Sequence, residues 1–198
     1  MYFIRIFLLL LFVFLFVTGT ASAYSPMQIN EQITQTKKLD TRADILESYF
    51  EKYNSPLKSE ARNFVEAADK YNLDWKLVAA ISGVESTFGK FTPGYKSYNA
   101  WGWGVYGNQA LGFKSWKDGI YTVSEGLRMH YYNKGLTNPY AINRIYAASP
   151  TWGSKVSYFL NDMTEFENDY QDNLNKTSVL DMTTQISGVS ASAKTSAI

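Results

Sequence analysis

The sequence predicts a mainly α-helical domain at about residues 40–170, with a small β-hairpin or ordered loop near residues 96–113. Apolar residues recur at helical spacing in successive segments that proline and glycine interrupt. One segment between them is instead rich in Gly, Tyr, Asn and Trp. Trp101 and Trp103 alternate there with small residues before a turn signal at Gly107-Asn108, which favours a hairpin over a helix.

Three helices are predicted before residue 90. The first begins behind a cap at Asp40 and stops at Ser55-Pro56, and the second follows directly. The third begins at Asp74, a favourable N-cap, and ends at Gly89. Their apolar stripes are Ile45, Leu46, Tyr49, Phe50 and Tyr53; Leu57, Ala61, Phe64, Val65, Ala68 and Tyr71; and Leu77, Val78, Ile81, Val84 and Phe88.

Three more helices are predicted after the hairpin. Ser115 with Asp118 three residues later forms a capping-box arrangement at the start of one. Asn138-Pro139 opens the next, because proline suits the first helical position. The last long helix follows Ser149-Pro150. The stripes of the first and last of these helices are Trp116, Ile120, Val123, Leu127 and Tyr131; and Trp152, Val156, Phe159, Leu160, Met163 and Phe166.

The ends of the chain have a different character. Residues 1–23 combine a basic start, an apolar run and Ala21-Ser22-Ala23, which together predict a secretory signal and an extracytoplasmic location, in the periplasm or cell wall. An uncleaved signal would instead hold the protein to the membrane. We interpret residues 24–39 as a flexible lead-in and the Ser, Thr and Asn-rich residues 171–198 as a disordered tail.

Composition excludes several classes of function. A formal net charge of +1 argues against an electrostatically driven nucleic-acid binder. The absence of cysteine excludes disulfides and thiolate chemistry, and with His130 as the single histidine a zinc site of the usual kind is not expected. There is no G-x-S-x-G elbow and no P-loop. We expect a monomer without metal or cofactor.

Glu85 is the main candidate for chemistry. It lies four residues after Ile81 and seven after Val78, so on a helix it shares their apolar face. Desolvation by such neighbours and the negative end of the helix dipole both raise the pKa of a carboxyl group. A general acid requires this shift. The alternative for an arbitrary helical glutamate is an ordinary salt bridge at the edge of the stripe.

Three motifs then resemble a known family. Glu85-Ser86-Thr87-Phe88-Gly89 looks like the E-S-x-aromatic-G motif of the lysozyme-like superfamily. Asn99-Ala100-Trp101-Gly102-Trp103 is similar to the N-x-aromatic-G-apolar motif of bacterial endo-β-N-acetylglucosaminidases. Tyr146-Ala147-Ala148-Ser149-Pro150-Thr151-Trp152, followed by Lys155-Val156, resembles their late Y-A-T-D-P-x-Y-x-x-K-V motif. The resemblance implies a lysozyme-like fold.

The resemblance also implies roles for individual residues. Glu85 would be the catalytic acid, and Tyr146 would help to position the reacting group. Two positions depart from the family pattern, with Ser149 in place of Asp and Trp152 in place of Tyr. These departures concern substrate detail more than the reaction class. The helical spacing of Trp152 and Trp116 predicts that both are core residues of their apolar stripes.

Four further residues are substrate-binding candidates. Trp101 and Trp103 lie two apart on a predicted strand, and their rings suit the apolar face of a pyranose. Asn99 and Ser86 belong to the same motifs, and an amide such as that of Asn99 can bond to acetamido groups. The alternatives are that both tryptophans are core residues and that Asn99 belongs to a turn.

The expected function is cleavage of β-1,4 bonds between N-acetylated sugars in the glycan strands of peptidoglycan. Glycosidases usually pair the acid with a second carboxylate, and the candidates are Asp118, Glu125 and Asp162, none of them compelling. A lytic transglycosylase, which manages with one glutamate, is a second reading, although its G-L-M-Q signature is missing. A catalytically idle glycan-binding module and a structural envelope protein are rivals of different classes.

Overall fold

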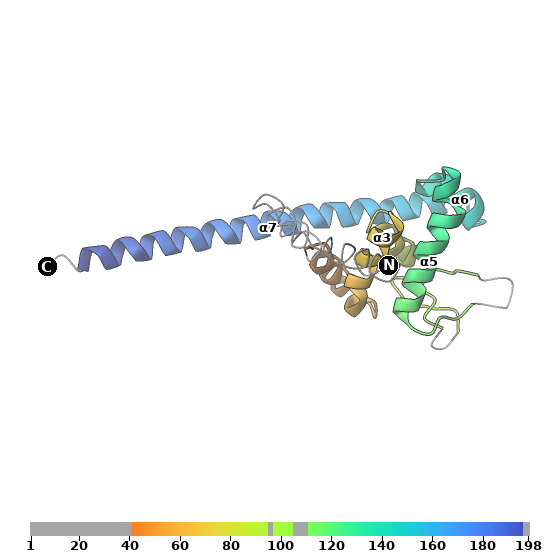
Figure 1. Cartoon of the computed structure of the whole chain (residues 1–198), viewed down its shortest axis with the longest axis horizontal. Coiled ribbons are helices and arrows are strands. Elements are labelled where there is room, and N and C mark those ends of the chain that lie inside the picture. The colour runs from red at the N-terminus through yellow and green to blue at the C-terminus, as the bar shows by residue number, and fades with distance from the viewer. Residues whose placement is uncertain (1–40, 95–96, 105–110, 196–198) are drawn as a thin grey trace, which may run out of the picture. The chain divides into compact units, whose positions relative to one another are not determined.

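The computed structural model describes residues 41–94, 97–104 and 111–195, and this part of the chain is mainly helical (Figure 1). A helix over residues 41–52 comes first. The remaining elements are η1 (Lys58–Glu60), α3 (Ala61–Tyr71), α4 (Leu77–Ser86), α5 (Trp116–His130), η2 (Tyr132–Lys134), α6 (Pro139–Tyr146) and α7 (Trp152–Thr195). The predicted signal, the lead-in and the cap at Asp40 lie outside the described residues.

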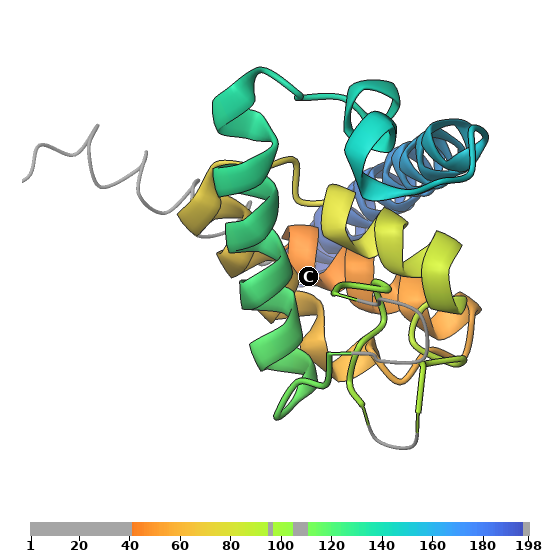
Figure 2. The ribbon, with the colours of Figure 1, turned by 90° about the vertical axis from the view of Figure 1, so that its right-hand side faces the viewer.

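Helix α4 is the central element of the fold. It packs against α3, α5 and α7, and Figure 2 shows it between α5 and α7. Its first seven residues, from Leu77 to Gly83, are all buried. A helix that is apolar on all sides belongs in a core. The other helices are amphipathic and cover it, so the position of α4 is fixed on several sides.

The end of α4 differs from the prediction. The helix ends at Ser86, and three consecutive residues, Thr87, Phe88 and Gly89, have positive φ angles of 51°, 58° and 80°. Glycine tolerates this conformation, whereas Thr87 and Phe88 adopt it at a cost. The ring of Phe88 is fully buried and contacts the rings of Tyr53 and Phe159, among others. Burial of this ring compensates for the strained backbone that places it under the helix.

The predicted caps of the later helices are confirmed. Ser115 Oγ accepts the backbone N–H of Asp118 at 3.1 Å at the start of α5. Asn138 Oδ1 accepts the N–H of Ala141 at 3.0 Å, with Pro139 in the first turn of α6. Asp74 is different, because its carboxylate bonds to the N–H of Lys76 in a turn that precedes α4. The helix itself begins at Leu77, later than predicted.

The segment near residues 96–113 contains no strand in its described parts, residues 97–104 and 111–113. The predicted hairpin is therefore not confirmed, and its turn at Gly107-Asn108 lies outside the described residues. A side chain explains the ordered loop. All four hydrogen-bonding positions of the Asn99 amide go to backbone groups of the same segment, which replaces the ladder of a hairpin.

Helix α7 also differs from the prediction, because it continues to Thr195 where a disordered tail was expected from residue 171. The segment from Trp152 to Met163 has buried positions that pack on α4 and α6. Once this packed segment is helical, each residue added at its C-terminal end gains a hydrogen bond without a new nucleation cost. Residues 171–195 contain no proline to stop this extension.

Within residues 41–94, 97–104 and 111–195, no helix combines enough length with enough apolar character to cross a bilayer.

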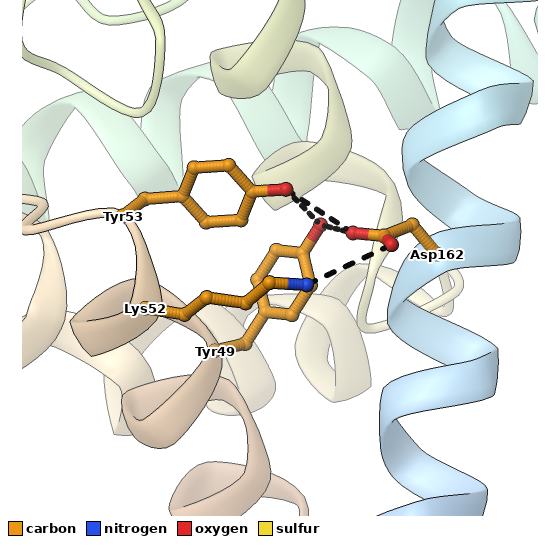
Figure 3. Close-up of polar contacts among 4 residues, drawn as sticks. All are labelled: Tyr49, Lys52, Tyr53 and Asp162. Carbon is orange, nitrogen blue, oxygen red and sulfur yellow. Dashed lines mark hydrogen bonds and ion pairs between the residues drawn. The ribbon is translucent and has the colours of Figure 1, made fainter.

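A polar cluster joins helix 41–52 to α7 (Figure 3). The hydroxyl groups of Tyr49 and Tyr53 both donate to Asp162 Oδ2, the second at 3.2 Å. Lys52 Nζ lies 3.8 Å from the other oxygen of Asp162. Tyr49 is buried, and desolvation together with the bond to Asp162 raises the pKa of its hydroxyl far above the ordinary value. This cluster ties the start of the domain to its last helix.

We expect Tyr49→Phe to lower the free energy of unfolding by about 1 to 3 kcal/mol, because a hydrogen bond to a charged group is lost. The raised pKa adds a pH dependence. Unfolded tyrosine ionises near pH 10, whereas folded Tyr49 keeps its proton, so the wild type should lose stability above about pH 10. Urea unfolding at pH 7 and at pH 10.5 measures both effects.

Tyr158→Phe is the matched control, because Tyr158 is an exposed tyrosine on α7. It should change neither the stability at pH 7 nor the alkaline loss. Equal behaviour of the two variants would show that the Tyr49 bond contributes nothing.

Candidate functional site

Glu85 lies in the last turn of α4, where its carboxyl group meets two other segments. Its Oε1 accepts the indole N–H of Trp152 at 2.6 Å. Its Oε2 lies so close to Gly102 that a Cβ built on that glycine would be 3.1 Å away. Gly102 also has a φ of 59°, so both its backbone conformation and this close approach favour glycine. The carboxyl group is thus placed between α7 and the loop of residues 97–104.

The surroundings of Glu85 favour its protonated form. The residue as a whole is exposed, but its carboxyl end is partly enclosed, and this desolvation raises the pKa of Glu85 above its ordinary value. The Trp152 hydrogen bond and the charge of Lys155 lower the pKa by smaller amounts. The C-terminal end of α4 acts in the same direction as desolvation. Glu85 therefore keeps its proton to a higher pH than a solvated glutamate.

Tyr146 lies beside Glu85 at the end of α6. Its ring stacks on that of Trp152, with centroids 4.6 Å apart and planes at 23°. Its hydroxyl donates to the backbone carbonyl of Trp101 at 2.7 Å. Desolvation, and then the nearby charge of Glu85, raise the pKa of Tyr146 well above its ordinary value. The hydroxyl group thus stays neutral, and its proton is donated to the carbonyl of Trp101.

A half-open pocket of about 440 Å³ lies beside Tyr146. Tyr146 and Gly102 belong to its lining, and both also border Glu85. The remaining lining residues are Trp103, Gly104, His130, Tyr131 and Ile145. Most of the exposed lining surface is polar, and the rings of Trp103, Tyr131 and Tyr146 can contact the apolar face of a sugar. His130 is exposed at this pocket.

The two candidate tryptophans occupy different places. Trp103 is half-buried, lines the pocket and has its ring 5.7 Å from that of Tyr146. Trp101 is fully buried and donates its indole N–H to Val78 O at 2.9 Å. A ring with no exposed surface cannot stack on a ligand. The expectation that Trp101 contacts substrate directly is therefore wrong. Side-chain alternation did not hold because the segment is a loop.

Asn99 and Ser86 are likewise buried and act within the protein. The Asn99 amide is fully used in the loop, as described above. Ser86 Oγ accepts the N–H of Gly89 at 2.8 Å and lies 2.8 Å from Ala100 O. It therefore links the end of α4 to the loop that carries Gly102. The structure gives both residues a supporting place in the site, in contrast to the expected contact with substrate.

Trp152 is the site residue that periodicity failed to find. Its place in the apolar stripe of α7 predicted a core residue, and its ring is indeed buried. The bond from its N–H to Glu85 depends on tertiary packing. The available signal was its position in the late motif, where the resembling family has Tyr. Asn143 prepares this position, because its side chain bonds to Ser149 O at 2.9 Å and to Gly153 N at 3.0 Å.

The three candidate second carboxylates are not brought to Glu85 by any described contact. Asp162 bonds to two tyrosines and lies ten residues after Trp152, about 15 Å further along α7. Paired glycosidase carboxylates lie about 5 to 10 Å apart. Asp118 accepts the N–H of Lys114 at 3.0 Å in the capping box of α5. Glu125 is exposed on the same helix.

Within residues 41–94, 97–104 and 111–180, no three His, Cys, Asp or Glu side chains lie close enough together to hold a metal ion.

Comparison with protein-family models gives no match, and no curated protein is significantly similar to the chain. The motif resemblance therefore supports a proposal about function and does not assign a family.

Gly102→Ala should disturb Glu85 directly. The added methyl group would lie 3.1 Å from Oε2, displace water and raise the pKa of Glu85 further. The positive φ adds a backbone cost of about 1 to 2 kcal/mol. An NMR titration of the Glu85 carboxyl and a measurement of the free energy of unfolding test both effects.

Gly135→Ala provides the matched control, because Gly135 has a φ of 78° and no atom within 4 Å of an added Cβ. It should show a similar loss of stability and leave the pKa of Glu85 unchanged. A Glu85 pKa that is the same in wild type and Gly102→Ala would contradict the described geometry.

Proposed function

We propose that this chain is a glycosidase that cuts β-1,4 bonds between N-acetylated sugars in the glycan strands of bacterial peptidoglycan. Glu85 is the proton donor of this reaction. The observation that carries the proposal is the position of its partly desolvated carboxyl group against Gly102, which lines a pocket together with Trp103, Tyr131 and Tyr146. The three motifs of the resembling family supply residues to this same place.

The chemistry follows from the raised pKa. Cleavage of a glycosidic bond requires protonation of the leaving oxygen as the sugar ring develops oxocarbenium character. A glutamate whose pKa is raised by desolvation keeps its proton to higher pH and can supply it. Trp103 and Tyr131 would contact the sugar that lies in the pocket, since their rings line it. This arrangement would bring the glycosidic oxygen toward Glu85.

Tyr146 has a more specific role in this proposal than general assistance. Because its hydroxyl proton is donated to Trp101 O, the oxygen offers only acceptor lone pairs to a ligand. An acetamido N–H is a suitable donor to such an oxygen. Tyr146 would therefore position an N-acetylated sugar beside Glu85, and the buried Trp101 would contribute through its backbone carbonyl.

Lytic transglycosylation is the second candidate, and one observation favours it. Among the described residues no carboxylate belongs to the pocket lining, and Glu85 borders two of its lining residues, Gly102 and Tyr146. The three sequence candidates for a partner are placed elsewhere or have no described contact with Glu85. In transglycosylation the hydroxyl of the sugar itself attacks, so one glutamate suffices. We keep hydrolysis first because the G-L-M-Q signature is missing. Export by the N-terminal signal is part of both proposals.

Glu85→Gln should reduce glycan cleavage at least about 100-fold, because an amide cannot donate the proton. The test is digestion of purified peptidoglycan by residues 24–198, the form that signal cleavage yields, with fragments identified by mass spectrometry. Reducing ends identify a hydrolase, and anhydro-muramic ends identify a transglycosylase. Wild-type activity should fall as pH rises through the pKa of Glu85, because the acid form is then lost.

The stability of Glu85→Gln separates loss of chemistry from loss of fold. Desolvation disfavours the ionised carboxyl, so the neutral variant should be at least as stable as wild type at pH 8. If wild type and variant bind the wall equally and neither releases fragments, the protein is a glycan-binding module.

Tyr146→Phe should lower kcat about tenfold or more, with a smaller change in KM, if the hydroxyl holds the sugar for the reaction. The aromatic stack on Trp152 remains in this variant, so the change is confined to one oxygen. Tyr140→Phe, an exposed tyrosine of the same helix, is the control. Kinetics on soluble glycan oligomers measure both variants, and unchanged kcat in Tyr146→Phe would remove this residue from the mechanism.

A further inference from the structure

We propose that Trp152 is the positioning residue of Glu85, and that it determines which carboxyl oxygen carries the proton. The inference rests on the proposed function and goes beyond it. Its basis is the 2.6 Å hydrogen bond from the indole N–H to Oε1. A protonated carboxyl group has one hydroxyl oxygen and one acceptor oxygen. Since Oε1 accepts from Trp152, the proton resides on Oε2.

The position of Oε2 agrees with this assignment. It is the oxygen that faces Gly102, and Gly102 is part of the pocket lining. Trp152 therefore turns the proton-bearing oxygen toward the pocket and holds the other oxygen toward α7. Without the indole N–H, rotation of the carboxyl group would make the two oxygens equivalent. Fixed orientation of a reacting group is worth a large factor in rate.

Trp152 can hold this position because it is itself fixed on two sides. Its ring is buried and stacks on Tyr146, and its backbone lies in the first turn of α7, which the Asn143 side chain secures through Gly153. An indole has a donor and no acceptor, so it cannot exchange this role with Glu85. The family that the motifs resemble has Tyr at this position, which also carries a donor on an aromatic ring.

The same bond favours release of the proton. When Glu85 delivers its proton, Oε1 becomes part of a carboxylate, and a hydrogen bond to a charged oxygen is stronger. Other groups also face this carboxyl: Lys155 on α7, whose charge acts in the same direction, and the neutral hydroxyl of Tyr146 on α6. Removal of the N–H alone should therefore stabilise the acid form and raise the pKa of Glu85.

The first test is an NMR titration of the indole N–H signals of the five tryptophans, labelled with ¹⁵N and assigned by through-bond experiments. The Trp152 signal should move with pH in wild type and stay constant in Glu85→Gln. This measurement needs no enzymatic activity. A Trp152 signal that does not move, or that moves equally in Glu85→Gln, would overturn the proposed contact.

The second test separates a positioning role from a merely structural one. Trp152→Phe keeps an aromatic ring against Tyr146 and removes the donor. We expect kcat to fall about ten- to hundredfold and the alkaline limb of the kcat/KM profile to move to higher pH. Trp152→Tyr restores a donor and should recover part of both effects. Trp116→Phe, a tryptophan packed on Tyr98 at another place, should change neither.

The outcomes distinguish this inference from the proposed function. If wild type cuts no glycan while the Trp152 signal titrates with Glu85, the glycosidase proposal fails and the orienting contact stands. If wild type cuts glycan and Trp152→Phe retains full kcat and an unchanged pH profile, the positioning role fails and the glycosidase proposal stands. Poor folding of Trp152→Phe would leave the wild-type titration and Trp152→Tyr to decide.

Discussion

Burial of Phe88 is the constraint on which the rest of the site depends. The ring lies under α4, where a Cβ on Gly83 would be only 2.7 Å from it, and it contacts the aromatic core on several sides. To reach that place the chain must leave the helix through residues of positive φ. The helix therefore stops one residue after Glu85, and the carboxyl group lies at its C-terminal end instead of on a continuing helical face.

Most residues of the segment Glu85-Ser86-Thr87-Phe88-Gly89 then have a physical task. Phe88 anchors the segment, and Gly89 accepts a backbone conformation that a side chain would strain. Ser86 connects α4 to the loop through Ala100 O, which brings Gly102 to Glu85. A motif that looks like a chemical signature is thus largely a folding device. Ser86, Phe88 and Gly89 fix the place of Glu85, the one member to which we assign chemistry.

Asparagine side chains carry much of the remaining organisation. Asn99 satisfies backbone groups of the loop, and Asn143 does the same between α6 and α7. Both replace regular backbone pairing where the chain turns sharply. The loop then presents Trp103 and Gly102 to the pocket, and the turn presents Trp152 to Glu85. The catalytic proposal and the fold therefore depend on the same few amides.

The sequence by itself determined the helical class, the caps at Ser115 and Asn138, and Glu85 as the residue to examine, because spacing and capping are local properties. Tertiary structure decided the rest. It buried Trp101 and exposed part of Trp103, bound Asp162 to Tyr49, and brought Trp152 to a glutamate 67 residues earlier. Periodicity identifies the buried face of a helix but not the residues of other helices that contact it. The direction of an indole N–H depends on packing between helices, which no local pattern encodes.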